Sequence, residues 1–226
     1  MYKRQENFPG FESIAGFEFA EALYNQAIKM GAEIVYDKVT GLQDYGSHKG
    51  VQTEYGGELL AKAVILATGA RVRPLGLENE DRFIGSGVSY CATCDGAFFK
   101  DKNVAVVGGG NTALDDALVL SFTSKKVYLI HRSDTFSGEK RLLEKLQEHD
   151  NVVFILDSEV TAINGSERLE SLGIRNKVSG EEQTLDVDAV FIAIGHVPDN
   201  KAFASLVELD AYGYITVSYT HLRAHE

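Results

Sequence analysis

Tryptophan is absent from this chain of 226 residues, proline occurs three times and cysteine only twice. The N-terminus lacks the charged, apolar and small-residue layout of a signal peptide, so we expect a cytoplasmic location. Two cysteines are too few for the disulfide framework of a small secreted protein. Basic residues are outnumbered, with 22 Lys and Arg against 33 Asp and Glu and a formal charge of −11. This balance disfavours proteins that follow nucleic-acid phosphates or bind anionic lipid, because both need a basic surface. No apolar run approaches the roughly 20 residues that span a bilayer.

The residues that are present indicate a folded α/β protein, with 44% apolar and 24% charged residues. In the first part, Ser13 is expected to cap an amphipathic helix that ends at Gly31. Strands are expected over 33–36, 51–55, 58–61 and 63–67, the last one buried and ending in Thr68-Gly69, with a linker over 71–74. In the second part, strands over 103–107, 127–130, 152–156 and 189–194 alternate with helices over 111–121 and 138–148, and a β meander covers 160–175.

Cys91 and Cys94 are separated by two residues and followed by Asp95. Such a pair forms a small disulfide ring that opens and closes without large backbone movement, provided that one thiol ionises near neutral pH. Asp95 is positioned to deliver or remove the proton. Zinc is disfavoured because a structural site takes four ligands, and no second C-x-x-C or C-x-x-H is present. A pair of inert buried thiols is the remaining alternative.

A glycine-rich turn joins the strand over 103–107 to the helix over 111–121 and reads Gly108-Gly109-Gly110-Asn111-Thr112-Ala113. This matches G-x-G-x-x-A in the strand-to-helix context that dinucleotide binding requires. Gly110 lets the backbone approach a pyrophosphate, and the helix N-terminus offers oriented N–H groups. An ordinary glycine-rich turn is the alternative.

The strand over 127–130 ends about twenty residues after the glycine-rich turn, at the point where the ribose of a dinucleotide cofactor is recognised. His131 and Arg132 stand there instead of an acidic residue. A cation at this point favours a 2′-phosphate and therefore NADP over NAD. A solvated surface charge is the alternative for Arg132. Two further strands end in a small residue and glycine, at Gly69 and Gly195, which lets backbone approach a flat cofactor. A plain strand exit is the alternative for each.

Taken in order, several motifs resemble the low-molecular-weight, bacterial-type thioredoxin reductases, within the FAD/NAD(P)-dependent pyridine nucleotide-disulfide oxidoreductases. The resemblance covers about residues 6–216. The motifs that carry it are N-F-P-G at 7–10, A-T-G-A at 67–70, C-A-T-C-D-G at 91–96, V-G-G-G-N-T-A at 107–113, L-I-H-R at 129–132 and A-I-G-H-V-P at 193–198.

The resemblance implies two Rossmann-like domains, with the NAD(P) domain inserted into the FAD domain. It assigns 6–73 and 197–216 to a partial FAD-binding domain and 74–196 to an essentially complete NAD(P)-binding domain that carries the redox pair. The implied reaction passes electrons from NADPH through FAD to the Cys91–Cys94 disulfide and on to thioredoxin, in a homodimer. The implied site residues are Cys94 nearest the flavin, Asp95 as the acid, Asn7, Thr68 and Gly69 beside FAD, and Gly108, Gly110, Asn111, Thr112, His131, Arg132 and Gly195 at the nicotinamide cofactor.

This sequence departs from the family pattern in three places. The first G-x-G-x-x-G and the C-terminal Gly-Asp segment, which hold FAD in the family, are absent, so we expect weak FAD binding and little turnover by this chain alone. Residues 1–5 and 217–226 are expected to be tails foreign to the protein, which would make the chain an internal fragment. Ser133 and Ser137 replace two arginines of the H-R-R-x-x-x-R reader. NADH or ferredoxin therefore stays open as the electron donor, and an inactive nucleotide-binding fragment is a further alternative.

Overall fold

The computed structural model describes residues 4–5 and 8–216. The chain divides into two compact units, one formed by residues 1–66 with 202–206 and the other by residues 67–201 with 207–226. Among the described residues, no helix is long and apolar enough to cross a membrane. The α/β class expected from the sequence is confirmed.

The first unit contains one long helix and a small antiparallel sheet. Its elements are β1 (Arg4–Gln5), β2 (Ile14–Ala15), α1 (Gly16–Lys29), β3 (Val39–Asp44), β4 (Lys49–Thr53) and β5 (Gly57–Ala61). Strands β4 and β5 form the expected hairpin, and β3 adds a third strand that the sequence did not indicate. Gly57 has a φ of +79°, which suits the tight reversal before β5.

Three expectations for the N-terminal part of the chain are wrong. The cap of α1 is Ala15 and not Ser13, because the Glu18 side chain reaches back to accept the Ala15 N–H at 3.1 Å. Residues 33–36 and 63–67 form no strand. An apolar run becomes a strand only where other strands take up its N–H and C=O groups, and no described strand pairs with either run. Ile65 is accordingly 92% exposed.

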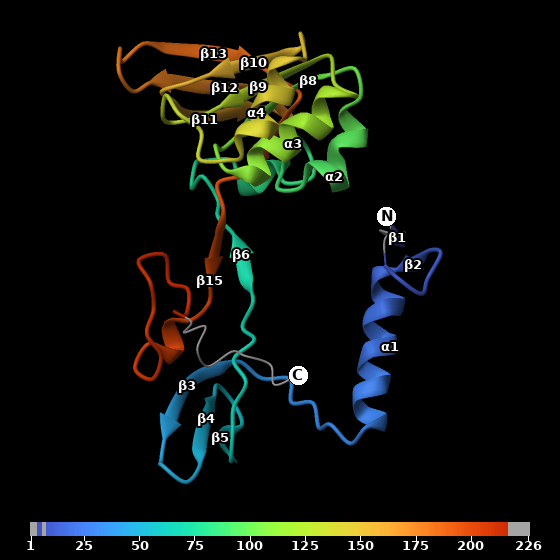
Figure 1. Ribbon diagram of the computed structural model, residues 1–226, viewed down its shortest axis with the longest axis vertical. Helices are drawn as coiled ribbons and strands as arrows, with labels where there is room; N and C mark the ends of the chain where they lie inside the picture. The colour runs from blue at the N-terminus through green and yellow to red at the C-terminus, as the bar shows by residue number, and fades with distance from the viewer. Residues whose placement is uncertain (1–3, 6–7, 217–226) are drawn as a thin grey trace. The chain divides into compact units, whose positions relative to one another are not determined.

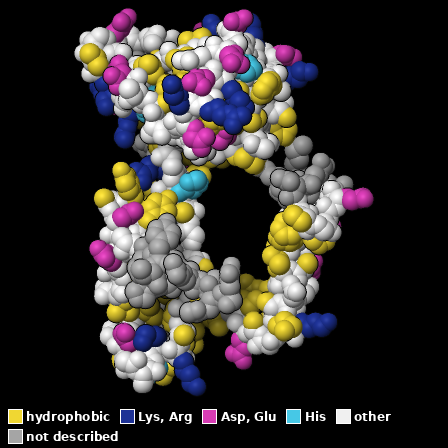
Figure 2. Space-filling view, in the orientation of Figure 1, with side chains coloured by type: hydrophobic (Ala, Val, Ile, Leu, Met, Phe, Trp, Pro, Cys, Tyr) yellow, Lys and Arg dark blue, Asp and Glu magenta, His cyan; other side chains and the backbone are white. Residues whose placement is uncertain are grey.

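Helix α1 ends at Lys29, and Gly31, with a φ of +89°, terminates it as expected, but none of the helix residues is buried. Phe17, Leu23, Tyr24 and Ile28 are all exposed. Figure 2 shows hydrophobic surface in yellow over α1. The periodicity of the sequence therefore predicted the helix correctly, but the apolar face of the helix is not covered by the described residues.

The second unit is built around a five-stranded parallel sheet with the order β10-β9-β8-β14-β7 (Figure 1). Its strands are β7 (Val88–Ser89), β8 (Asn103–Val107), β9 (Lys126–Ile130), β10 (Val152–Ile155) and β14 (Ala189–Ile192). Its helices are α2 (Ala92–Asp95), α3 (Asn111–Ser121) and α4 (Lys140–Gln147), with the 3₁₀ helices η1 (Asp81–Phe83) and η2 (Gly96–Phe99). The order of the first three strands, β10-β9-β8, is that of a mononucleotide-binding half of a Rossmann fold.

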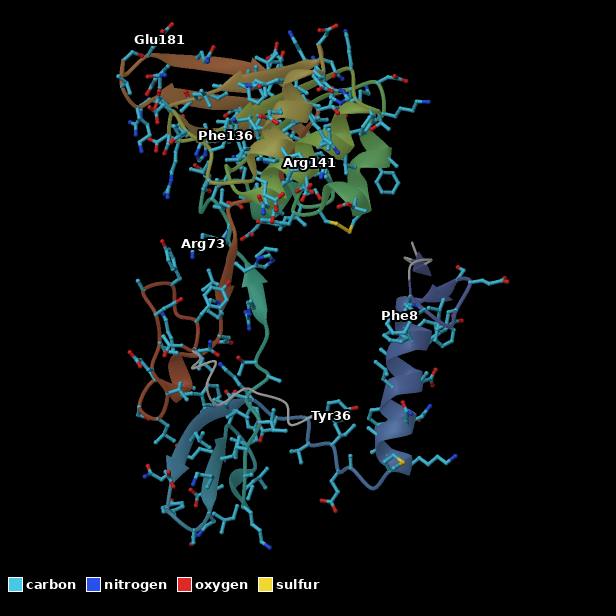
Figure 3. All side chains as sticks on the ribbon, viewed as in Figure 1. Phe8, Tyr36, Arg73, Phe136, Arg141 and Glu181 are labelled. Carbon is cyan, nitrogen blue, oxygen red and sulfur yellow. A yellow bond between two sulfur atoms is a disulfide. The ribbon has the colours of Figure 1, made fainter. Side chains whose placement is uncertain are left out.

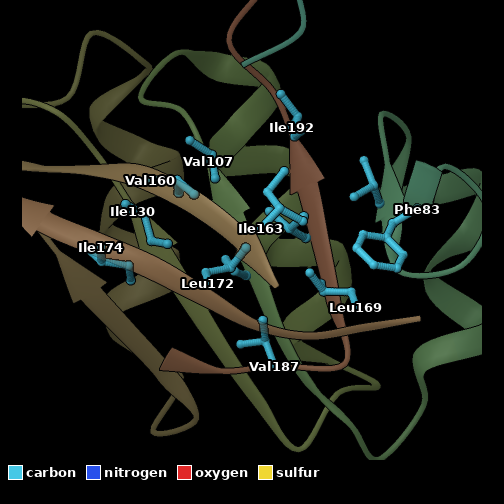
Figure 4. Packing of buried hydrophobic residues seen from close by; sticks show 13 residues of the cluster. Phe83, Val107, Ile130, Val160, Ile163, Leu169, Leu172, Ile174, Val187 and Ile192 are labelled. Atoms are coloured by element: carbon cyan, nitrogen blue, oxygen red, sulfur yellow. The ribbon is translucent and has the colours of Figure 1, made fainter. Parts of the chain in front are cut away.

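Two apolar layers sandwich this sheet because its strands are buried on both faces. Val104 and Val106 of β8 pack with residues of α3 and α4 in one cluster. Ala105 and Val107, which alternate with them, pack against the antiparallel strands β11 (Ser158–Gly165) and β12 (Leu169–Asn176) in the other. Figure 4 shows this second cluster. Strand β13 (Glu182–Asp186) completes the meander.

Two chain segments of the second unit run antiparallel as β6 (Ala70–Val72) and β15 (His196–Pro198). The linker expected over 71–74 is thus partly a strand, and a second segment from the other end of the sequence pairs with it. The 3₁₀ helix η3 (Lys201–Phe203) follows β15.

Candidate active site

A disulfide joins Cys91 and Cys94, as the spacing of the two cysteines predicted. Cys91 ends the chain segment that leaves β7 and is the N-cap residue of α2, while Cys94 lies within that short helix. Cys94 is exposed and Cys91 is half-buried. The sulfur–sulfur bond is visible in yellow beside α2 in Figure 3. The disulfide is therefore open to reaction from the surface of this unit.

A buried serine organises the disulfide segment. The hydroxyl of Ser89 accepts the Cys91 N–H at 3.2 Å and donates to Oδ2 of Asp95 at 2.7 Å. The first turn of α2 is closed by the Cys94 N–H, which donates to Sγ of Cys91 at 3.1 Å. Ser89 thus ties the Asp95 carboxylate to the backbone of Cys91. The sequence reasoning missed Ser89, although its place two residues before Cys91 was the available signal.

A second group that sequence reasoning missed is Glu80, which is only 2% exposed. Its carboxylate accepts the N–H groups of Leu75, Gly76 and Leu77 at 3.0, 2.7 and 3.3 Å, and the hydroxyl of Tyr90 at 2.7 Å. Burial and the neighbouring Glu80 charge raise the pKa of Tyr90 well above its usual value. Glu80 therefore ties the segment after β6 to the residue directly before the disulfide.

The glycine-rich turn lies between β8 and α3, where the sequence placed it. Gly108 has a φ of +150°, and a Cβ atom there would collide with the carbonyl of Ala193 and the side chain of Ala113. At Gly110 a Cβ atom would meet only Ser137 Oγ, at 3.9 Å. Gly108 is therefore required by packing, whereas Gly110 leaves free space in front of the N-terminus of α3, which no side chain caps.

His131 and Arg132 follow β9, the second strand of the sheet. The His131 ring stacks on Phe136, with centroids 5.0 Å apart and planes at 19°, and its Nε2 lies 3.0 Å from the Thr135 carbonyl oxygen. Arg132 is exposed. The labelled Phe136 in Figure 3 marks the loop over residues 133–138 that holds the imidazole.

This 133–138 loop folds back onto the glycine-rich turn. The backbone N–H groups of Ser137 and Gly138 donate to the Gly109 carbonyl at 2.9 and 3.0 Å, and the Ser137 hydroxyl donates to the same oxygen at 3.2 Å. Asn111 is occupied nearby, because its Oδ1 accepts the Glu139 N–H at 2.7 Å. The turn and the loop together form one wall of a cavity.

The cavity has a volume of about 600 Å³. The predicted cofactor residues that line it are Gly108, Gly110, Thr112, His131, Arg132 and Gly195. Asn111 does not line it, nor does Ser133, whereas Ser137 does. Arg73 also lines the cavity, and its buried Nε has no hydrogen-bond partner among the described residues. An anionic ligand would satisfy that donor.

The residues expected beside FAD are not gathered in this cavity. Thr68 and Gly69 are exposed, and Gly69 has a φ of +69°. The Thr68 hydroxyl donates to Oδ1 of Asn200 at 2.7 Å, and Asn200 is buried and donates to the Gly213 carbonyl at 3.1 Å. Asn7 and residues 217–226 lie outside the described residues.

Comparison with known proteins gives a consistent result. The family model described as pyridine nucleotide-disulphide oxidoreductase matches residues 2–222. A thioredoxin reductase of Streptomyces coelicolor is 42% identical over 97% of this chain and 69% of its own length. A bifunctional thioredoxin reductase/thioredoxin of Mycobacterium leprae is 41% identical over 94% of this chain and 46% of its own length.

Solved structures agree with these sequences. Thioredoxin reductase from Lactococcus lactis superimposes with a TM-score of 0.73 at 32% identity, covering 95% of this chain and 71% of that one. Thioredoxin reductase from Giardia duodenalis gives a TM-score of 0.74 at 34% identity, with the same two coverages.

Proposed function

The chain belongs to the pyridine nucleotide-disulphide oxidoreductases and, within them, to the thioredoxin reductases, and from this we propose that it passes electrons from NADPH through FAD to the Cys91–Cys94 disulfide and on to thioredoxin. The observation that carries the proposal is the disulfide itself, formed by a closely spaced pair with Cys94 exposed. A relative that joins thioredoxin reductase and thioredoxin in one chain supports thioredoxin as the partner.

The residues around the disulfide are suited to thiol chemistry. After reduction, the Cys94 N–H that now points at Sγ of Cys91 would stabilise negative charge on that sulfur. Asp95 follows Cys94 in the sequence and its carboxylate accepts the Ser89 hydroxyl, which supports the proposal that it exchanges a proton with a cysteine. We assign Cys91, Cys94 and Asp95 to the reaction, with Cys94 nearest the flavin and Ser89 as a positioning residue.

The cavity fits a dinucleotide phosphate group. Gly110 leaves open space before the uncapped N-terminus of α3, and the buried Nε of Arg73 lacks a partner among the described residues. We assign Gly108, Gly110, Asn111, Thr112 and Gly195 to the binding of the nicotinamide cofactor, and His131 with Arg132 to its 2′-phosphate. Asn7, Thr68 and Gly69 are assigned to FAD. Bound flavin supplies the two electrons that reduce the disulfide.

A specific observation supports NADH as an alternative donor. Ser137 lines the cavity at a position where the family pattern has an arginine, and Ser133 replaces a second one. Each missing guanidinium removes a charge-assisted contact worth roughly 1.5 to 3 kcal/mol. Reduced ferredoxin is a third donor to be tested. The remaining proposals are the FAD domain over 6–73 and 197–216, the NAD(P) domain over 74–196, a homodimer, and a cytoplasmic location.

The test follows electron transfer from the cysteine pair to thioredoxin without added flavin. The protein is reduced with dithiothreitol, desalted and mixed with oxidised thioredoxin, and thiols are alkylated and counted by mass spectrometry. We expect two thiols to appear in thioredoxin as the Cys91–Cys94 disulfide forms. C91S and C94S variants should fail to transfer two electrons, whereas D115N, at an exposed carboxylate, should behave as wild type.

Thioredoxin that stays oxidised beside the reduced wild-type protein would reject the proposal. Equilibration in glutathione buffers tests the alternative of an idle nucleotide-binding module, because idle cysteines would form no intramolecular disulfide. The donor is then identified by adding FAD with NADPH, NADH or reduced ferredoxin and measuring the rate at which thioredoxin thiols appear.

A further inference from the structure

Helix α3, against which the redox segment packs, carries a buried carboxylate that the proposed reaction does not use. Asp116 belongs to α3 and is only 9% exposed, whereas the adjacent Asp115 points to solvent. The Asp116 carboxylate accepts the backbone N–H of Ala92, the residue that follows Cys91. A buried carboxylate on the helix of the nucleotide-binding unit thus contacts the backbone of the redox segment directly.

The redox segment is packed firmly against α3 at this point. Ala92 is 1% exposed and belongs to the same apolar cluster as Ala113, Ala117 and Leu120 of α3. A Cβ atom at Gly96 would lie 3.0 Å from Cδ2 of Leu120. Since Ala92 is the first residue of α2, its N–H has no partner within that helix, and Asp116 supplies the acceptor.

Besides Asp115 of α3 itself, the titratable residues on α2 and β9, which pack against α3, are Asp95, Lys126 and Tyr128. Of these residues only Asp115 shifts the pKa of Asp116. Burial raises the pKa of Asp116 to about 6, the Ala92 N–H lowers it, and Asp115 raises it. The charged residues of α4, which packs on the same helix, are Lys140, Arg141, Glu144 and Lys145, and none of them contributes to this shift.

We propose that Asp116 is a positioning residue of the redox centre, which holds α2 through the Ala92 N–H and takes up a proton when the Cys91–Cys94 disulfide is reduced. A thiolate formed one residue away from this contact would repel an ionised Asp116 carboxylate, so reduction and protonation of Asp116 favour each other. The inference rests on the redox role of the cysteine pair in the proposed function.

Glutathione can serve as the electron donor that reduces the Cys91–Cys94 disulfide. Two glutathione thiols give up two electrons and two protons and form one glutathione disulfide, while the bond between Sγ of Cys91 and Sγ of Cys94 breaks. One cysteine ends as a thiol and the other as a thiolate. The first proton is on the thiol and the second is on the Asp116 carboxylate.

The test measures the thiol–disulfide equilibrium of the purified protein against glutathione from pH 5 to pH 8, by alkylation of free thiols. In the wild type, we expect the pH dependence of the equilibrium constant to change slope near pH 6. In D116N, which keeps an oxygen acceptor for the Ala92 N–H but carries no charge, this change should vanish. At pH 7 the D116N equilibrium should lie about tenfold further toward the dithiol, a difference of about 30 mV for two electrons.

Two further variants separate charge from position. D115N removes a neighbouring exposed charge and should keep the wild-type change of slope. D116A removes the acceptor as well as the charge, and it should speed hydrogen exchange at Ala92, whereas D116N should not. Superimposable pH profiles of wild type and D116N would overturn the inference while leaving the proposed function intact. A cysteine pair that never forms a disulfide in any glutathione buffer would overturn both.

Discussion

Replacing Glu80 with alanine should destabilise the second unit more than any other removal of a single carboxylate outside the redox segment. The buried carboxylate accepts three backbone N–H groups, from residues 75–77, and the hydroxyl of Tyr90. A hydrogen bond to a charged group contributes about 1.5 to 3 kcal/mol, and a buried donor left without an acceptor costs about 1 to 3 kcal/mol. Residues 75–77 are only partly buried or exposed, so water replaces some of the lost contacts. We therefore expect a loss of about 3 kcal/mol, within the usual range for a broken buried network.

The assay is urea unfolding followed by far-ultraviolet circular dichroism. With a denaturant slope of about 2 kcal/mol per molar, a loss of about 3 kcal/mol lowers the midpoint by about 1.5 M. The variant Y90F, which removes one of the four donors, should lower it by about a third as much, and the double variant E80A/Y90F should be less destabilised than the sum of the two. E78A, at a nearby exposed glutamate, is the matched control and should leave the midpoint unchanged within about 0.5 kcal/mol. An E80A midpoint equal to that of E78A would refute the reasoning.

Three other predictions concern the nucleotide site and Asp116. G108A should lower the free energy of unfolding in urea by about 1 to 3 kcal/mol, because the added methyl group collides with its neighbours. G110A should keep the wild-type midpoint but weaken the binding of the nicotinamide cofactor, measured by calorimetry. Equal urea midpoints for the two variants would contradict this prediction. S133R and S137R should each raise the preference for NADPH over NADH by about 10- to 100-fold, through a new contact to the 2′-phosphate, and competitive binding of the two nucleotides measures this ratio. Unchanged ratios would show that these positions do not face the phosphate.

The pKa of Asp116 is raised in the folded protein to about 6 from 3.8, so protonation of this carboxyl group favours the folded state. This contribution is fully present below pH 3.8 and is lost between about pH 3.8 and 6. D116N should therefore match the wild type near pH 4 and exceed it at pH 7 by on the order of 3 kcal/mol in urea unfolding. A difference between the two proteins that does not grow over this pH range would contradict the prediction.

Local sequence pattern was sufficient for much of the second unit. The strand over 103–107 and the helix over 111–121 were predicted with the bounds that the structure shows, because the apolar run, the glycine turn and the helix periodicity all agree. The disulfide between Cys91 and Cys94 was predicted from the spacing of the two cysteines and the neighbouring Asp95, because a pair separated by two residues can close into a small ring. The convergence of the glycine turn with His131 and Arg132 on one cavity also followed, because consecutive parallel strands end at the same edge of the sheet.

Tertiary structure decided what depends on partners distant in sequence. The apolar runs over 33–36 and 63–67 looked like strands, but a strand needs neighbouring chains for its backbone hydrogen bonds, and no described strand pairs with these runs. Glu80 and Asp116 look like ordinary surface carboxylates in the sequence. Only the fold buries them, the first against the residues before Cys91 and the second against the residue after it, because burial is set by the elements that pack around a side chain and not by its sequence neighbours.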